Sequence, residues 1–187
     1  MLLLLVMLAQ AADCGPTSPA LLRDVAAQAC ASGEVAVLYL RGLVAARDAA
    51  AAGGSPASLV VVHEAIASLE GLAPPPRQAA IAIYVLKAAA AAAQGERDEM
   101  ALFLAQALQA ESLQLAARQP GAPLVTAHEA AGDLWLLVYR HAEARQAFLD
   151  ALRIIGPTRR ILLGLARAEA RLERGPSACP DTEDTCP

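Results

Sequence analysis

Apolar residues recur every three or four positions along most of this 187-residue chain, which is the spacing of helices with one buried face. Short clusters of glycine and proline interrupt the recurrence, among them Gly53-Gly54, Gly71 and Pro74-Pro75-Pro76. No stretch alternates apolar and polar residues in the way that is typical of a strand. The pattern therefore predicts an all-α fold of antiparallel helical hairpins joined by short turns.

The punctuation predicts where each helix begins and ends. Ser18-Pro19 and Ser55-Pro56 each offer a capping side chain followed by the residue favoured at the first helical position. Ser32-Gly33 and Gly53-Gly54 read as stops. We expect helices over residues 18–32, 34–52, 55–71, 77–94, 97–118, 124–138, 142–155 and 158–174.

The N-terminal segment resembles a targeting signal. Leu2–Ala9 is an apolar run, and Ala9-Gln10-Ala11 has the small-x-small pattern that a signal peptidase cuts, so residues 1–11 are predicted to be a signal peptide. The run is shorter than the ~20 residues of a membrane-spanning helix, and no lysine or arginine precedes it. Two alternatives stay open: a packed helical turn in a cytoplasmic protein, and a lipoprotein at Cys14, where Asp13 stands in place of the expected small residue.

The four cysteines support export, because disulfides persist in an oxidising compartment such as the periplasm. Three pairings are possible, and the local one joins Cys14 to Cys30 and Cys179 to Cys186. The second bond would close a small ring in an acidic tail, residues 176–187. Neither end has the Cys-x-x-Cys spacing typical of zinc sites, and the tail lacks the ligand spacing of a calcium loop.

Composition narrows the class of partner. The formal net charge of -4 and the pI of about 5.4 argue against nucleic acid, whose phosphates need a basic surface. The 46 alanines account for a mean hydropathy of +0.40 without a transmembrane span. Fourteen arginines against one lysine, with no asparagine, indicate a GC-rich and bacterial genome.

Small and aromatic residues recur at regular intervals in residues 124–174. The residues concerned are Gly132, Trp135, Ala144, Phe148, Ala151 and Pro157. This spacing resembles the tetratricopeptide repeat, in which the glycine lets two helices approach, the alanine packs at their crossing and the aromatic residue fills the space toward the next repeat. The segment departs from that family at His128, where tryptophan is usual, and at Pro157, which comes one residue late.

Earlier hairpins repeat these intervals with weaker residues, so that the resemblance extends over about residues 35–174. Ala65, Ala107 and Ala151 take the same place in three hairpins, 42 and 44 residues apart, where the family repeats every 34. The resemblance implies that residues 12–175 form a short right-handed solenoid of stacked hairpins, with the eighth helix as a C-terminal cap. Because alanine is so frequent, a helical bundle without such stacking remains the alternative.

Catalytic motifs are not found in the sequence. His63-Glu64 and His128-Glu129 begin like the zinc-protease motif, but neither is followed by a second histidine one turn later. No phosphate-binding glycine loop and no nucleophile elbow is present. We expect a protein that is not an enzyme and that uses neither a metal nor another cofactor.

Binding by shape is the expected function. The first helices of stacked hairpins line a concave face that commonly holds a peptide or a partner helix. The helical stagger assigns to that face Tyr39, Arg41, Tyr84, Lys87 and His128, with Trp135 as a further candidate that the repeat also uses for packing. The sequence predicts an exported scaffold or adaptor for a protein or peptide partner. The alternative is a structural helical-bundle subunit of an envelope complex.

Overall fold

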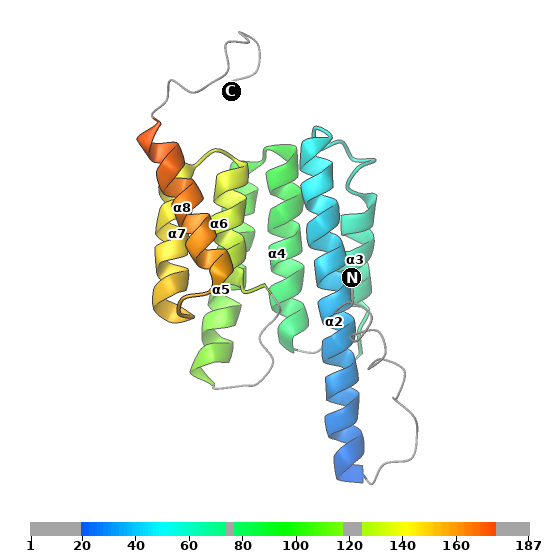
Figure 1. The fold of residues 1–187 in the computed structure, drawn as a ribbon. Coiled ribbons are helices and arrows are strands. Elements are labelled where there is room, and N and C mark those ends of the chain that lie inside the picture. Colours follow the sequence, from blue (N-terminus) through cyan, green and yellow to red (C-terminus); the bar gives the residue numbers. More distant parts are fainter. Residues whose placement is uncertain (1–19, 74–76, 118–124, 175–187) are drawn as a thin grey trace, which may run out of the picture. The chain divides into compact units, whose positions relative to one another are not determined.

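The computed structural model describes residues 20–73, 77–117 and 125–174, with backbone alone for residues 20–32 and Arg77. These residues form seven α-helices and no strand, which confirms the all-α prediction (Figure 1). The helices are α2 (Ala20–Ala51), α3 (Val60–Glu70), α4 (Arg77–Gln94), α5 (Arg97–Ala116), α6 (Ala127–Leu137), α7 (His141–Ile154) and α8 (Arg159–Glu173).

The first two predicted helices are one. Helix α2 continues through Ser32-Gly33, where the sequence predicted a stop. A glycine within a helix destabilises it by only about 0.5–1 kcal/mol relative to alanine, and the alanine-rich sequence on either side favours helix strongly enough to offset this. The stop lies instead at Gly53 and Gly54, whose positive φ angles of 82° and 67° are left-handed conformations that glycine adopts without strain.

The third predicted helix begins later than expected. Ser55 and Pro56 form a turn in which the Ser58 hydroxyl donates to the Ser55 carbonyl at 2.7 Å, and the helix begins only at Val60. The serine-proline pair thus marks a tight turn that positions Leu59, whose side chain is fully buried. The remaining predicted helices, from residue 77 onward, differ from the observed ones by three residues or fewer at each end.

The chain divides into two compact units, residues 1–124 and 125–187. In the first unit α4 packs against α2, α3 and α5 (Figure 1). The hairpin turn after α2 lies against the end of α4, because a Cβ on Gly54 would collide with the Ala93 carbonyl. Along the helices, a Cβ on Gly42 of α2 would stand 2.6 Å from Leu86 of α4, so this glycine allows the two helices to approach closely.

The second unit consists of the α6–α7 hairpin and α8. Helix α8 packs on both helices of this hairpin (Figure 1), just as α4 packs on both helices of the α2–α3 hairpin in the first unit. In each unit, therefore, the helix that follows a hairpin covers both of its members. None of the helices described is long and apolar enough to cross a bilayer.

Two predicted segments lie outside the described residues. These are the signal peptide at 1–11 and the acidic tail at 176–187, with Cys14, Cys179 and Cys186. Cys30 falls within α2, in the stretch described by its backbone alone.

Candidate packing site and interaction surface

The side chain of Phe148, on α7, is fully buried between two glycines of neighbouring helices. A Cβ built on Gly132 of α6 would stand 2.5 Å from the phenyl ring, and one built on Gly164 of α8 would stand closer still. Carbon atoms in van der Waals contact are about 3.5–4.0 Å apart, so neither position accepts a side chain without movement of the ring. The ring and the two glycines together hold α6, α7 and α8 in contact.

The residues predicted to pack the repeat divide into a buried set and a peripheral pair. Ala144 and Ala151 are fully buried on the same face of α7 as Phe148, four residues before it and three residues after it. Trp135 of α6 is half-buried, and Pro157 is exposed beyond the end of α7. Gly132, Ala144, Phe148 and Ala151 therefore form the packing site, with Trp135 and Pro157 at its edge.

Sequence reasoning missed Gly164, although a signal for it exists. Thr126 and Gly132 are six residues apart, and Thr158 and Gly164 repeat this spacing 32 residues later. Both threonines are N-caps, and each accepts a backbone hydrogen bond at 3.1 Å from the residue three positions further on. The start of α8 thus repeats the start of α6, in the cap as well as in the glycine.

The Glu129 carboxylate joins the two helix starts. Its Oε2 accepts from the Thr126 backbone N–H at 3.3 Å and completes a capping box on α6. Its Oε1 accepts from the Thr158 hydroxyl at 2.8 Å, while the same hydroxyl oxygen accepts from the Ile161 N–H. Because Glu129 is buried, these bonds are expected to matter more than exposed ones would. The carboxylate fixes where α8 begins relative to α6.

Ion pairs at the surface complete this arrangement. Arg160 of α8 donates to Asp133 of α6 through Nε at 3.1 Å and Nη2 at 2.5 Å. Arg145 of α7 pairs with Glu169 of α8 at 3.4 Å. The side chains of both pairs are between 32% and 49% exposed, so each pair contributes at most about 1 kcal/mol.

The α4–α5 hairpin of the first unit has the same buried intervals with different residues. Met100, Leu104 and Ala107 of α5 are buried at the spacing of Ala144, Phe148 and Ala151. Ala88 of α4, at the place of the glycine in the later hairpin, is also fully buried. Leucine and alanine thus stand at the positions that phenylalanine and glycine occupy in the later hairpin, which conserves the total side-chain volume approximately.

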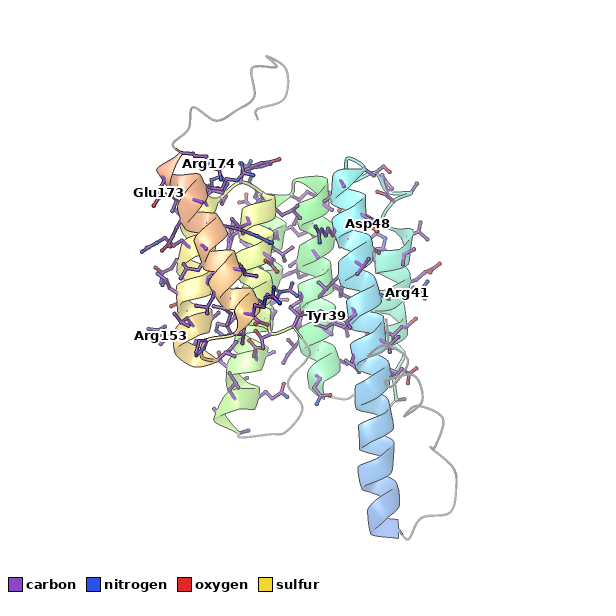
Figure 2. All side chains as sticks on the ribbon, in the orientation of Figure 1. Tyr39, Arg41, Asp48, Arg153, Glu173 and Arg174 are labelled. Carbon is purple, nitrogen blue, oxygen red and sulfur yellow. The ribbon has the colours of Figure 1, made fainter. Side chains whose placement is uncertain are left out.

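The five residues predicted to line a groove do not share one face. Tyr39 is fully buried and His128 is 7% exposed, whereas Arg41, Tyr84 and Lys87 reach solvent. Tyr39 and Arg41 lie on opposite sides of α2 (Figure 2). Two residues of separation turn a helix by about 200°, so these side chains cannot both point into the same groove.

Two of these residues pair with carboxylates of α3. Arg41 pairs with Glu64 at 3.3 Å, and Lys87 pairs with Glu70 at 2.9 Å. Tyr84 stands one helical turn before Lys87, on the narrow strip of α4 that is not buried. We call Arg41, Tyr84 and Lys87, with the two glutamates, the α3 rim: two ion pairs and a half-buried tyrosine one helical turn from Lys87.

The histidines form no cluster in the part of the chain that the structure describes. His63 is exposed, and the His141 ring stands edge-on to Tyr139, with the ring centroids 6.4 Å apart. Among the described residues no group of three His, Cys, Asp or Glu side chains could hold a metal ion. Comparison with protein-family models, with curated proteins and with solved structures finds no match for this chain.

Proposed function

We propose that this protein is a non-catalytic scaffold of tetratricopeptide-like hairpins that binds a protein or peptide partner. The observation that carries the proposal is Phe148 between Gly132 and Gly164. A large aromatic residue that bridges its own hairpin and the next helix through glycines is the contact that the resemblance implies. A contact that joins a hairpin to the helix after it supports stacking over a closed bundle.

The packing order of the helices supports the same conclusion. In each unit the helix after a hairpin packs on both of its members. This order can be continued from hairpin to hairpin, and proteins built in this way commonly present extended surfaces to peptides and helices. We therefore propose stacking into a short solenoid as the arrangement of the chain.

The α3 rim is the best candidate for partner contact among the residues singled out from the sequence. Tyrosine combines a large apolar area with a polar end and is frequent where binding energy concentrates. Arg41 and Lys87 are already paired with carboxylates, so a partner must offer charges of both signs or replace these ion pairs. We propose a polar, charged segment of a protein as the occupant, and no nucleic acid.

Site-specific photo-crosslinking tests this function. A photoreactive phenylalanine analogue replaces Tyr84 in the full chain expressed in its host, and the crosslinked products are identified by mass spectrometry. The matched control carries the same analogue at Leu102 of α5, which is exposed but lies outside the α3 rim. One discrete protein adduct at position 84 and none at 102 supports the proposal. Identical products at both positions, or none at 84, contradict it.

A structural subunit of an envelope complex is the second candidate, and a specific surface favours it. Val37 and Val44 of α2 are 62% and 60% exposed, and with Leu40 between them they form an apolar stripe along one side of the helix. A permanent assembly would cover such a stripe. Sedimentation of the protein purified from its host separates the candidates, because a subunit remains in a large complex whereas an adaptor is recovered largely alone.

We propose the periplasm as the compartment, with cleavage after residue 11 and two disulfide bonds. Intact mass of the protein from the periplasmic fraction, with and without thiol alkylation, tests both points. Loss of the first eleven residues and four unreactive cysteines supports export. A full-length chain with four reactive thiols contradicts it and favours a cytoplasmic adaptor.

A further inference from the structure

Helix α8 exposes an apolar strip on the side that faces away from its own unit. Leu162 and Leu163 are 49% and 48% exposed, and Ala166 and Ala170 continue the strip at four-residue intervals from Leu162. The opposite side of the helix holds Ile161, Gly164 and Ala168, which are buried. A helix that only capped a stack would be polar on its outer side, whereas α8 carries this apolar strip beside its exposed charged residues.

The repeated threonine-glycine spacing at the starts of α6 and α8 allows the strip to be compared with the corresponding residues of α6. With a shift of 32 residues, the strip corresponds to Ala130, Ala131 and Leu134 of α6 and to Val138 at its C-cap. All four of these residues are buried. Helix α8 is the last helix that the structure describes. The strip on α8 thus has apolar residues at the positions that are buried in α6, and we expect a further helix to cover it.

Arginines border the strip along its length. Leu163, Arg167 and Arg171 follow one another at four-residue intervals, so the two arginines extend the row that this leucine begins. Arg159 and Arg174 add a positive charge near each end of α8, and Figure 2 shows Arg174 at its C-terminal end. Within the described part of the chain none of these four arginines forms an ion pair, in contrast to Arg160 and Arg145.

We propose that this face of α8 binds an amphipathic helix of a partner protein whose apolar side is bordered by acidic residues. The inference rests on the proposed scaffold function and adds to the α3 rim a second contact surface with its own partner chemistry. The partner's leucines or alanines would cover Leu162, Leu163 and Ala166, and its carboxylates would meet Arg167 and Arg171. A helix satisfies its own backbone hydrogen bonds, so it can cover an apolar strip without leaving buried polar groups.

Binding to three designed helical peptides tests the proposal. The peptides share one leucine-alanine face and carry glutamate, glutamine or lysine along its edge, and anisotropy measures their affinity for the full chain. We expect the glutamate peptide to bind at least about tenfold more tightly than the lysine peptide, which corresponds to about 1.4 kcal/mol. Equal affinities of the three, or no binding of the glutamate peptide, overturn the proposal.

Variants locate the site. Leu163→Gln should weaken the binding of the glutamate peptide by about tenfold or more. The double variant Arg167→Glu with Arg171→Glu should bind the lysine peptide more tightly than the glutamate peptide. Leu113→Gln on α5 and Arg47→Glu on α2 are the matched controls, since both residues are exposed elsewhere. Circular dichroism establishes that each variant is folded. Binding that the α8 variants leave unchanged overturns the proposal.

Other occupants give distinct results. Concentration-dependent dimerisation that Leu163→Gln abolishes would show that a second copy covers the strip, and would overturn the proposal. Peptide binding that appears only after Asp181, Glu183 and Asp184 are neutralised would assign the strip to the chain's own acidic tail, with the same consequence. If the peptides fail but Tyr84 still crosslinks to a partner, the surface on α8 is wrong and the scaffold function stands.

Discussion

The phenyl ring of Phe148 occupies the space in which a Cβ of Gly164 would stand, although the two residues belong to different helices. The ring has the same relationship to Gly132 of α6. The packing of this one side chain of α7 thus requires two glycines: Gly132 in its own hairpin and Gly164 in the helix after that hairpin. Stability measurements can test this dependence directly.

Gly132→Ala and Gly164→Ala should each lower the free energy of unfolding by about 1–3 kcal/mol, because the new methyl group collides with a ring that is packed on all sides. Urea denaturation followed by circular dichroism measures the change. Phe148→Leu added to either variant should recover part of the loss, since the smaller side chain leaves room for the methyl group.

Gly33→Ala is the matched control for these variants. Gly33 also lies within a helix, but nothing is near the position of its Cβ. The same substitution should therefore raise stability by about 0.5–1 kcal/mol. Destabilisation of equal size at positions 33, 132 and 164 would contradict the account of the Phe148 site.

Thr158→Val should destabilise the protein by about 0.5–2 kcal/mol, because it removes the N-cap of α8 and the hydroxyl that Glu129 accepts from. Thr158→Ser keeps the hydroxyl and should remain close to the original stability. Thermal unfolding of the two variants side by side measures the difference. If valine and serine behave alike, the hydroxyl does not contribute to the start of α8.

Tyr139→Gly should stabilise the protein. Tyr139 follows α6 with a φ of 60°, a left-handed conformation that a residue with a side chain adopts at a cost of about 1–2 kcal/mol. Its ring is 74% exposed, so little buried contact is lost. Gly156→Ala is the reverse control, because Gly156 has a φ of 97° and should lose stability on gaining a side chain. A lower melting temperature for Tyr139→Gly would contradict this account.

Two carboxyls should influence the acid dependence of stability in opposite directions. A hydrogen bond from the Arg140 guanidinium lowers the pKa of Glu143. A lowered pKa in the folded state contributes stability that is present above the unfolded value of about 4.3 and is lost as the pH falls through the folded value. Glu143→Gln should thus lower stability near pH 7 and have little effect at pH 2.

Glu99 behaves in the opposite way. A hydrogen bond with Glu96, then burial, then the negative charge of Glu96 raise the pKa of Glu99. A raised carboxyl pKa means that the ionised form is disfavoured in the folded state, so the cost is complete above the folded pKa and is gone below the unfolded value of about 4.3. Glu96→Gln should raise stability near pH 7 and not at pH 2. Urea titrations at both pH values compare the two variants, and changes of the same sign at pH 7 would contradict these assignments.

Much of the fold follows from the sequence because its helix starts and stops are local signals. Prolines, paired glycines and capping residues act within a few residues of their position, and α4, α5, α7 and α8 begin and end near the predicted residues. Ser32-Gly33 failed as a stop because one glycine, without a proline or a second glycine, is a weak interruption in an alanine-rich helix. The turn at Ser55 to Leu59 could not be separated from a helix start by its sequence.

The packing site was predicted in part. Gly132, Ala144, Phe148 and Ala151 were found because their intervals lie within one hairpin. Gly164 was missed because it belongs to the next helix, and only the repeated threonine-glycine spacing could have indicated it. The groove residues could not be predicted reliably. The spacing along the sequence gives the direction of each side chain around its own helix, but not which side of that helix packs against another helix. Tertiary packing decides this, and it buries Tyr39 and His128.

The central claim is that the protein binds its partner without changing it chemically. To test this, the partner identified by crosslinking at Tyr84 is purified, mixed with the full chain without a crosslink, and measured by native mass spectrometry. The account predicts a complex whose mass is the sum of the two chains, from which the partner is released with its mass unchanged. A partner that is cleaved or modified after incubation, or that forms no complex at micromolar concentration, would contradict the account.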